Sequence, residues 1–119
     1  MRFKELRSFM GLLILITITI LLISFLWKYN LILIIALALE SIILLIVFHK
    51  KHDIIYFIVG GICGPAAEMV AVHFGAWNFA NSNFYNIPLW LPLLWGIVLV
   101  SMKKATESLI NTFKKTSSK

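Results

Sequence analysis

Four runs of apolar residues, separated by short polar segments, organise the chain. They cover approximately residues 9–27, 31–48, 54–75 and 88–102. A membrane-spanning helix needs about 20 residues, with a range of about 17 to 25. The fourth run is short, so we expect either that its helix continues into Lys103 and beyond or that the bilayer thins locally. The pattern predicts an all-α fold, an integral membrane four-helix bundle with up-down-up-down order.

The composition agrees with a membrane protein. Hydrophobic residues make up 61% of the 119 residues and the mean hydropathy is +0.94, which excludes an ordinary soluble domain. We therefore interpret residues 1–119 as one membrane domain with a basic tail over residues 103–119. The first run is longer than the apolar part of a secretory signal and lacks a small-x-small cleavage pattern, so we interpret it as an uncleaved anchor.

The charged residues predict an orientation. The net charge is +6, and only Lys28 lies between the first and second runs. The other basic residues lie before the first run, between the second and third, or after the fourth: Arg2, Lys4, Arg7, Lys50, Lys51, Lys103, Lys104, Lys114, Lys115 and Lys119. With four spans, all of these clusters fall on one side, which predicts a cell-membrane protein with both termini cytoplasmic.

The tail and the lone cysteine exclude several other classes. The basic tail has Phe113 as its one aromatic residue, so it lacks the interleaved aromatics of a nucleic-acid groove, and we expect it to lie on the anionic inner leaflet. Cys63 stands alone, so no disulfide framework or thiolate metal site is expected. No phosphate-binding loop, metal-ligand cluster or hydrolase triad is visible, and we expect neither a metal nor a cofactor.

Short loops predict which helices are neighbours. The turn at residues 28–30 requires an antiparallel hairpin of the first two runs, and the tight loop at residues 49–53 predicts that the second and third runs also pack together. Thr17, Thr19 and Ser24 can bond back to carbonyl groups one turn earlier, so we assign them to packing, without partners elsewhere. Pro88 suits a helix start, whereas Pro92 should bend or delay the fourth helix.

Small residues follow one face of the third run, at Gly60, Gly64, Ala71 and Gly75, and Glu68 lies on the same face. The spacing of Gly60 and Gly64 permits a close helix–helix approach. Pro65 predicts a kink or a short unwound stretch at Gly60–Pro65. Irregular backbone at membrane depth must be buried in protein or line a cavity, which predicts that the third run lies at the centre of the bundle.

Glu68 is the centre of the candidate site. An ionisable side chain at membrane depth costs several kcal/mol unless it is protonated, paired or hydrated, so it is a functional-site hypothesis. Glu40 is the other catalytic candidate, because both carboxylates lie about 12 to 15 Å from the outer helix ends. Within about 6 Å of each other, the two would share one proton. Alternatively, each carboxyl group only forms a hydrogen bond between helices, which would stabilise the bundle by about 0.6 to 2 kcal/mol.

The candidate ligand-binding residues are Glu68, His73, Trp77, Asn78 and Trp95. Residues 76–86 carry amides and aromatic rings without charge, which suits a segment folded onto the outer interface. His73 shares the face of Glu68 only if the helix is distorted, and Trp77 also suits an interfacial belt. Trp95 lies deeper than an interfacial tryptophan, so its indole N–H should have a protein partner.

The segment from Glu68 to Trp95 resembles a fragment of integral-membrane carotenoid-biosynthesis proteins. The shared pattern is Phe-Gly-x-aromatic-x-aromatic, here Phe74 to Phe79, followed by an apolar run that contains proline and ends in tryptophan. The resemblance covers roughly a quarter of the chain. It implies that Glu68 protonates or hydrates a polyene double bond inside the bilayer. The chain departs from the family in its missing spans, in the close spacing of Glu68 to Phe74 and in the absence of a further acid in the outer loop.

Several functions remain open. The chain could be a small membrane protein with a polar site for an apolar lipid or isoprenoid ligand, or an enzyme in which Glu68 is a general acid. It could be an assembly partner, in a membrane complex or a homo-oligomer, whose glycine stripe docks another helix. It also resembles small proton-coupled multidrug exporters in length, but its strong charge bias argues against their antiparallel dimers.

Overall fold

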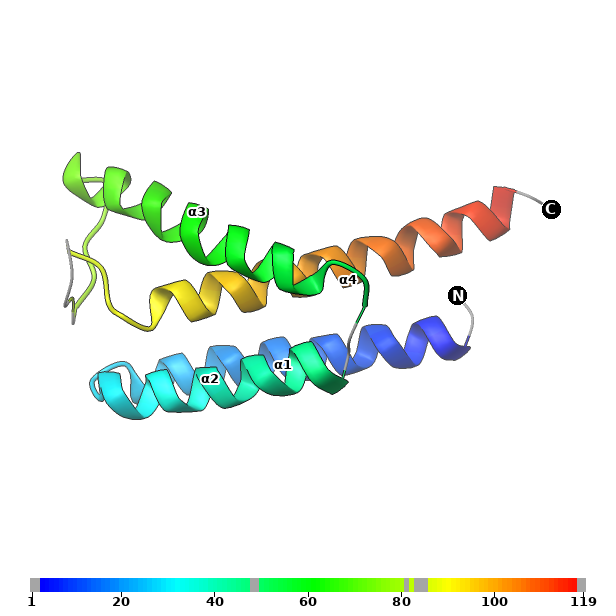
Figure 1. Ribbon diagram of the computed structural model, residues 1–119, viewed down its shortest axis with the longest axis horizontal. Helices are drawn as coiled ribbons and strands as arrows, with labels where there is room; N and C mark the ends of the chain where they lie inside the picture. Colours follow the sequence, from blue (N-terminus) through cyan, green and yellow to red (C-terminus); the bar gives the residue numbers. More distant parts are fainter. Residues whose placement is uncertain (1–2, 48–49, 81, 83–85, 118–119) are drawn as a thin grey trace.

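The structure, a computed structural model, describes residues 3–47, 50–80, 82 and 86–117. It contains four helices, α1 (Phe3–Leu26), α2 (Asn30–Val47), α3 (Asp53–His73) and α4 (Leu91–Ser117), and no β-strand in the part described (Figure 1). The all-α prediction is confirmed. Helices α1, α2 and α3 are each long and apolar enough to cross a membrane.

The proline residues set the start of α4. The helix begins at Leu91, so Pro92 lies in its first turn, where a missing backbone N–H costs little. Pro88 precedes the helix, so the prediction that it starts the fourth helix is wrong. Pro92 thus delays the helix, as expected. The helix then continues past the apolar run through Lys103 and Lys104, which confirms the continuation expected for the short fourth run.

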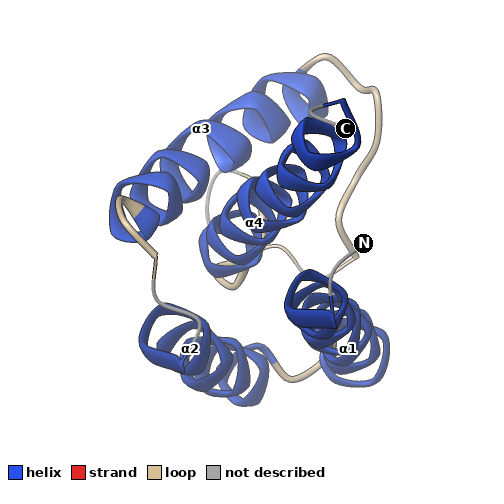
Figure 2. Cartoon of the chain, turned by 90° about the vertical axis from the view of Figure 1, so that its right-hand side faces the viewer, coloured by secondary structure: helices blue, strands red, loops and turns tan. Residues whose placement is uncertain are grey.

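Helix α4 occupies the centre of the bundle. It packs against α1, α2 and α3, and the end-on view in Figure 2 shows it between α3 on one side and the α1–α2 pair on the other. The prediction that the third run would be central is therefore wrong. The prediction that α2 and α3 pack together is also wrong, because α2 packs on α1 and α4, whereas α3 packs chiefly on α4.

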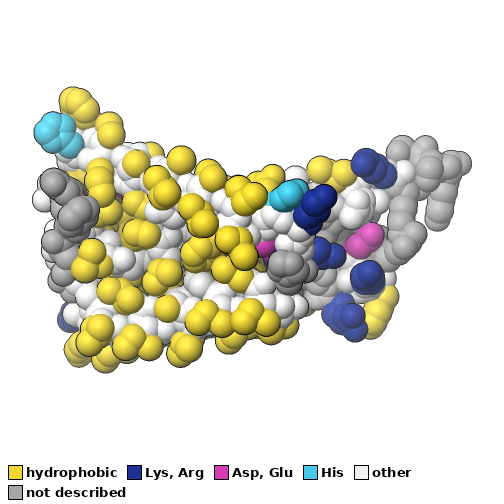
Figure 3. Space-filling view, in the orientation of Figure 1, with side chains coloured by type: hydrophobic (Ala, Val, Ile, Leu, Met, Phe, Trp, Pro, Cys, Tyr) yellow, Lys and Arg dark blue, Asp and Glu magenta, His cyan; other side chains and the backbone are white. Residues whose placement is uncertain are grey.

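The buried core and the exposed surface are both apolar. Leu33, Leu37 and Leu44 of α2 pack with Ile97 and Val100 of α4, and all five are fully buried. Large apolar side chains also cover the outside of the helices, as Figure 3 shows for one face. Such a surface is suited to lipid contact, because a soluble monomer rarely exposes large continuous apolar patches.

Both termini lie at one end of the molecule (Figure 1). Lysine and arginine side chains gather at this same end in Figure 3, and we call it the basic end. The helices therefore bring together the basic clusters that lie apart in the sequence. The orientation predicted from the charge pattern requires that these clusters lie on one side, and the arrangement of the helices meets this requirement.

Candidate functional site

Glycines and aromatic rings interlock where α3 crosses α4. A Cβ atom on Gly64 would lie 2.2 Å from Cγ of Trp95, and one on Gly96 would lie 2.7 Å from the ring of Phe57. A Cβ atom on Gly60 would lie 2.8 Å from Cβ of Leu99. The close approach predicted from the glycine spacing is thus present. The helix that occupies the glycine stripe is α4 of the same chain.

Helix α3 continues without interruption through Pro65. The predicted unwound stretch at Gly60–Pro65 is therefore wrong. A continuous helix pairs nearly all of its own backbone groups, so it has no need to be buried at the bundle centre, which explains why α3 can lie at the side. Regular helical spacing positions Glu68 one turn beyond Gly64.

Glu68 and Trp95 are in direct contact. The Trp95 indole N–H donates a hydrogen bond to the Glu68 carboxyl group, which confirms that this deep indole has a protein partner. The Glu68 side chain is half-buried, and its Oε2 atom is buried without a hydrogen-bond partner among the described residues. Gly64 makes room for the ring of Trp95, and the ring in turn holds Glu68. The crossing therefore produces a carboxyl group with one oxygen held by Trp95 and the other buried without a hydrogen-bond partner among the described residues.

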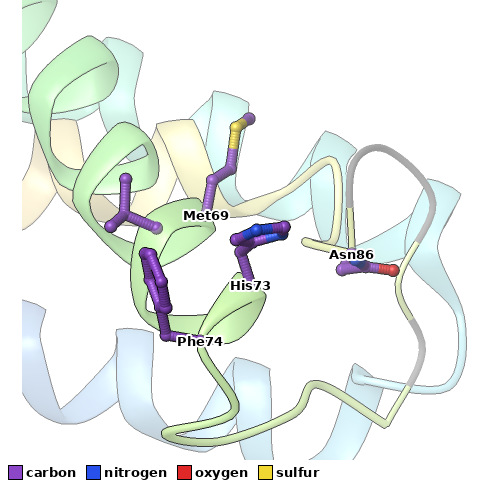
Figure 4. A pocket seen from close by; sticks show the side chains of 5 residues that line it. Met69, His73, Phe74 and Asn86 are labelled. Atoms are coloured by element: carbon purple, nitrogen blue, oxygen red, sulfur yellow. The ribbon is translucent and has the colours of Figure 1, made fainter.

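The other predicted ligand-binding residues lie apart from this pair. His73, Trp77 and Asn78 are exposed, and within the described ranges the side-chain hydrogen bond of Glu68 comes from Trp95 and from none of these three residues. His73 and Asn86 face each other across a cavity of about 280 Å³ that Met69, Val70 and Phe74 also line (Figure 4). The structure thus joins Glu68 to Trp95 and places the remaining candidates nearer the surface.

Glu40 belongs to a different pair of helices. Its side chain is 7% exposed on α2, and its Oε1 atom contacts the hydroxyl group of Thr19 on α1. Glu40 contacts Thr19 of α1 and Glu68 contacts Trp95 of α4, and the Oε2 atom of each carboxyl group has no hydrogen-bond partner among the described residues. The two carboxyl groups are therefore not hydrogen-bonded to each other. Thr17 and Ser24 bond only to carbonyls one turn earlier, as expected, but the assignment of Thr19 to packing alone is wrong.

A buried charge cluster at the basic end was not predicted from the sequence. Asp53 is fully buried, with its Oδ1 atom 2.8 Å from Nζ of Lys103 and its Oδ2 atom 2.7 Å from Nζ of Lys104. Lys103 also donates to the carbonyl of Lys51 at 2.7 Å, and the Lys50 amide donates to Asp53 at 2.9 Å. The cluster ties the start of α3 to the middle of α4. The sequence did carry a signal for this cluster. Asp53 directly precedes the third apolar run and Lys103 directly follows the fourth, and an up-down-up-down order brings these two run ends to the same end of the bundle.

The ionisation of this cluster follows from its contacts, which lie outside the apolar segments. Burial alone would raise the pKa of Asp53, but hydrogen bonds from Lys103, Lys104 and the Lys50 amide outweigh it, so this pKa lies below its ordinary value of 3.8. Burial alone would lower the pKa of Lys103, but the hydrogen bond and charge of Asp53 raise it above 10.5. The contacts therefore favour the charged forms of both groups.

Comparisons with protein-family models, with curated proteins and with solved structures found no match. The resemblance of the segment from Glu68 to Trp95 to carotenoid-biosynthesis proteins is accordingly neither supported nor refuted. No group of three or more His, Cys, Asp or Glu side chains that could hold a metal ion occurs among the residues that the structure describes. Functional inference therefore depends on the geometry of the site itself.

Proposed function

We propose that this protein is a four-span protein of the cell membrane with both termini in the cytoplasm. Three helices have the length and composition of membrane spans, and the apolar first half of α4 packs among them. The basic side chains gather at the end that holds the termini, and basic residues are enriched on the cytoplasmic side of membrane proteins (Figure 3).

The orientation can be tested with single cysteines in a Cys63→Ala background. Tyr29→Cys lies in the turn after α1 and Asn111→Cys lies near the end of α4, and both positions are exposed. In intact cells, an impermeant maleimide should label Tyr29→Cys and leave Asn111→Cys unlabelled until the cells are permeabilised. Labelling of Asn111→Cys from outside would contradict the proposed orientation.

Within this membrane domain, we propose that Glu68 binds a lipid-like ligand. The observation that carries the proposal is the buried Oε2 atom of Glu68, which has no partner in the described part of the chain. A polar atom inside a bilayer costs several kcal/mol when it lacks a hydrogen bond. A hydroxyl or amide group on an otherwise apolar lipid or isoprenoid would satisfy this oxygen, while Trp95 keeps the carboxyl group oriented.

If the protein is an isoprenoid- or lipid-modifying enzyme, the same carboxyl group would have to transfer a proton to the bound ligand. A small proton-coupled transporter would instead need the carboxyl group to exchange its proton between the two sides. The fixed contact with Trp95 supports binding, because it orients one oxygen and leaves the other without a hydrogen-bond partner in the described part of the chain. Binding is therefore the function that the geometry supports best, with catalysis and transport as further steps at the same group.

An assembly role is the second candidate, and a specific surface favours it. The face of α3 that points away from α4 carries the exposed residues Ile58, Ile62, Cys63, Ala66 and Ala67. Small residues next to bulky apolar ones permit a second helix to pack closely in a membrane. A partner helix, or a second copy of this chain, would therefore use this face, because α4 covers Gly60 and Gly64.

Native mass spectrometry from lipid nanodiscs distinguishes these roles. We expect the wild-type protein to retain an apolar ligand, the Glu68→Gln variant to lose most of it, and the Glu40→Gln variant to retain it. Glu40 is the matched control because its Oε2 atom also lacks a partner among the described residues, but its carboxyl group is 7% exposed and contacts Thr19 instead of Trp95. Equal retention by wild type and Glu68→Gln would refute the proposed site. A ligand-free oligomer that Ile62→Trp dissociates would favour the assembly role.

A further inference from the structure

A second cavity lies between α1 and α4, on different residues from the Glu68 site. Its volume is about 380 Å³, and the side chains that line it come from Phe9 to Ile20 on α1 and from Leu94 to Ala105 on α4. All of these side chains are apolar except two hydroxyl groups, those of Thr19 and Ser101. We call this cavity the α1–α4 groove.

The hydroxyl group of Ser101 is the unusual feature of the α1–α4 groove. Ser101 is 3% exposed, and its Oγ atom has no hydrogen-bond partner among the residues that the structure describes. Serine and threonine hydroxyls inside helices commonly bond to the carbonyl one turn earlier. Thr17, Ser24, Ser41 and Thr112 do so in this protein. Ser101 therefore offers a buried hydroxyl group to whatever occupies the groove.

The second hydroxyl group of the groove is already engaged. Thr19 Oγ1 lies 2.9 Å from the carbonyl oxygen of Leu15 and also contacts Glu40. These contacts leave Ser101 as the polar group in the groove that can bind an occupant. One hydroxyl group in an otherwise apolar groove suits a long apolar molecule that carries a hydrogen-bond acceptor.

The position of Ser101 indicates which acceptor this is. Ser101 lies three residues, about 4.5 Å along the helix axis, from Lys104 in the buried charge cluster at the basic end. The groove extends along α1 from Phe9 to Ile20, about 16 Å, which is about half of the 30 Å hydrocarbon core of a bilayer. Its length therefore matches one leaflet, and its hydroxyl group lies just inside the charged boundary.

A glycerophospholipid carries its groups in the same order. Its phosphate lies at the membrane surface, its ester carbonyls lie just inside, and its acyl chains extend toward the midplane. Basic side chains near that surface attract the phosphate, and lysine and arginine gather at this end of the molecule (Figure 3). An ester carbonyl at the depth of Ser101 would accept the hydrogen bond that this hydroxyl group lacks within the protein.

We infer that the α1–α4 groove holds one acyl chain of a glycerophospholipid from the leaflet at the basic end, with an ester carbonyl bound by Ser101. The inference requires that the protein lies in a membrane but does not require a ligand at Glu68. The groove is formed by α1 and α4, whereas Glu68 lies on α3. Loss of either site can therefore be measured separately.

The test uses a phosphatidylglycerol with a photoactivatable diazirine on one acyl chain. The full chain is reconstituted in vesicles of unlabelled phosphatidylglycerol that contain a small fraction of the probe, irradiated, digested and analysed by mass spectrometry. We expect peptides that cover residues 9–20 and 94–105 to carry more label than the exposed face of α3. An ether-linked probe without ester carbonyls should label the groove about threefold less, the effect of one hydrogen bond inside a membrane protein.

Two pairs of variants separate the hydrogen bond from the groove. Ser101→Ala should lower labelling by the ester probe about threefold and abolish the difference between ester and ether probes. Ser24→Ala is its matched control, because Ser24 bonds only to the carbonyl of Ile20 and does not line this groove. Val98→Phe should fill the groove and remove labelling by both probes, whereas Ile62→Phe on the exposed face of α3 should leave it unchanged.

Three results would overturn the inference. Uniform labelling of all exposed helix faces would show that the groove holds no particular lipid. A difference between ester and ether probes that persists in Ser101→Ala would show that another group binds the carbonyl. Crosslinks between two chains through α1 and α4, in place of lipid label, would assign the groove to a second copy. None of these three results would bear on the proposed ligand at Glu68, because ligand retention in nanodiscs is measured separately.

Discussion

Trp95 occupies the space that a side chain on Gly64 would need, and from that space its indole donates to Glu68 one turn further along α3. One tryptophan therefore packs the crossing of α3 and α4 and also orients the candidate carboxyl group. Packing and site geometry cannot be changed independently at this position. A substitution that displaces the ring should alter both the stability of the helix pair and the orientation of Glu68.

Gly64→Ala should destabilise the α3–α4 pair by about 1 to 3 kcal/mol, the usual effect of forcing extra atoms into a packed interface. The added methyl group would lie 2.2 Å from Cγ of Trp95, so the ring must move. The measurement is unfolding in mixed micelles, followed by circular dichroism. Ala67→Leu on the exposed face of α3 is the control and should change stability by less than about 0.5 kcal/mol. Equal effects would show that the ring does not limit this position.

Asp53→Asn should destabilise the fold by about 3 to 5 kcal/mol, because it removes the carboxylate that both Lys103 and Lys104 contact within a buried cluster. The same unfolding assay measures the effect. Glu107→Gln removes a second partner of Lys103, at 3.7 Å, but Glu107 is half-exposed. It should therefore cost no more than about 1 kcal/mol. A small effect for both variants would mean that the cluster contributes little to folding.

The same cluster predicts how stability depends on pH. The pKa of Asp53 is lower in the folded state than its ordinary value of 3.8, so its stabilisation is present above that value and is lost as pH falls through the folded pKa. The pKa of Lys103 is raised above 10.5, so its stabilisation is present below that value and is lost as pH rises through the folded pKa.

Wild-type stability should therefore be nearly constant between these limits, as far as this cluster determines it, and should fall on the acid side. In unfolding titrations, the Asp53→Asn variant should show a smaller fall below about pH 4 than the wild type. If both proteins lose the same amount of stability at acid pH, another carboxyl group controls that loss.

The sequence was sufficient to predict the helices and several features of the candidate site. Apolar runs predicted four helices, the glycine spacing predicted a close crossing, and the depth of Trp95 predicted a partner for its indole. Each of these depends on local spacing or depth, which a sequence records directly.

The pairing of helices could not be predicted in the same way. Helix α1 is apolar on all sides, so its sequence does not fix which face turns inward and did not reveal the contact between Thr19 and Glu40. The tight loop before α3 likewise limits the distance between two helix ends, but it does not require α2 and α3 to pack along their length. Helix α3 packs instead on α4, where Trp95 of α4 lies opposite Gly64 and Phe57 of α3 lies opposite Gly96, and the partners in each pair are far apart in the sequence.

Thr19→Val tests whether the contact with Glu40 stabilises the α1–α2 pair. The substitution preserves side-chain shape but removes the hydroxyl group that contacts Oε1 of the buried Glu40, whose Oε2 atom already lacks a partner among the described residues, so we expect a loss of about 1 to 3 kcal/mol. Thr17→Val is the matched control, because Thr17 is exposed and bonds only to the carbonyl of Leu13.

The same substitution should be nearly neutral in a Glu40→Met background, since replacing both polar partners by apolar groups removes the unsatisfied group. A double-mutant cycle in mixed micelles measures this difference as a coupling free energy. A coupling near zero would show that Glu40 does not depend on Thr19. The carboxyl group would then be satisfied in another way, and Glu40 would remain the other catalytic candidate beside Glu68.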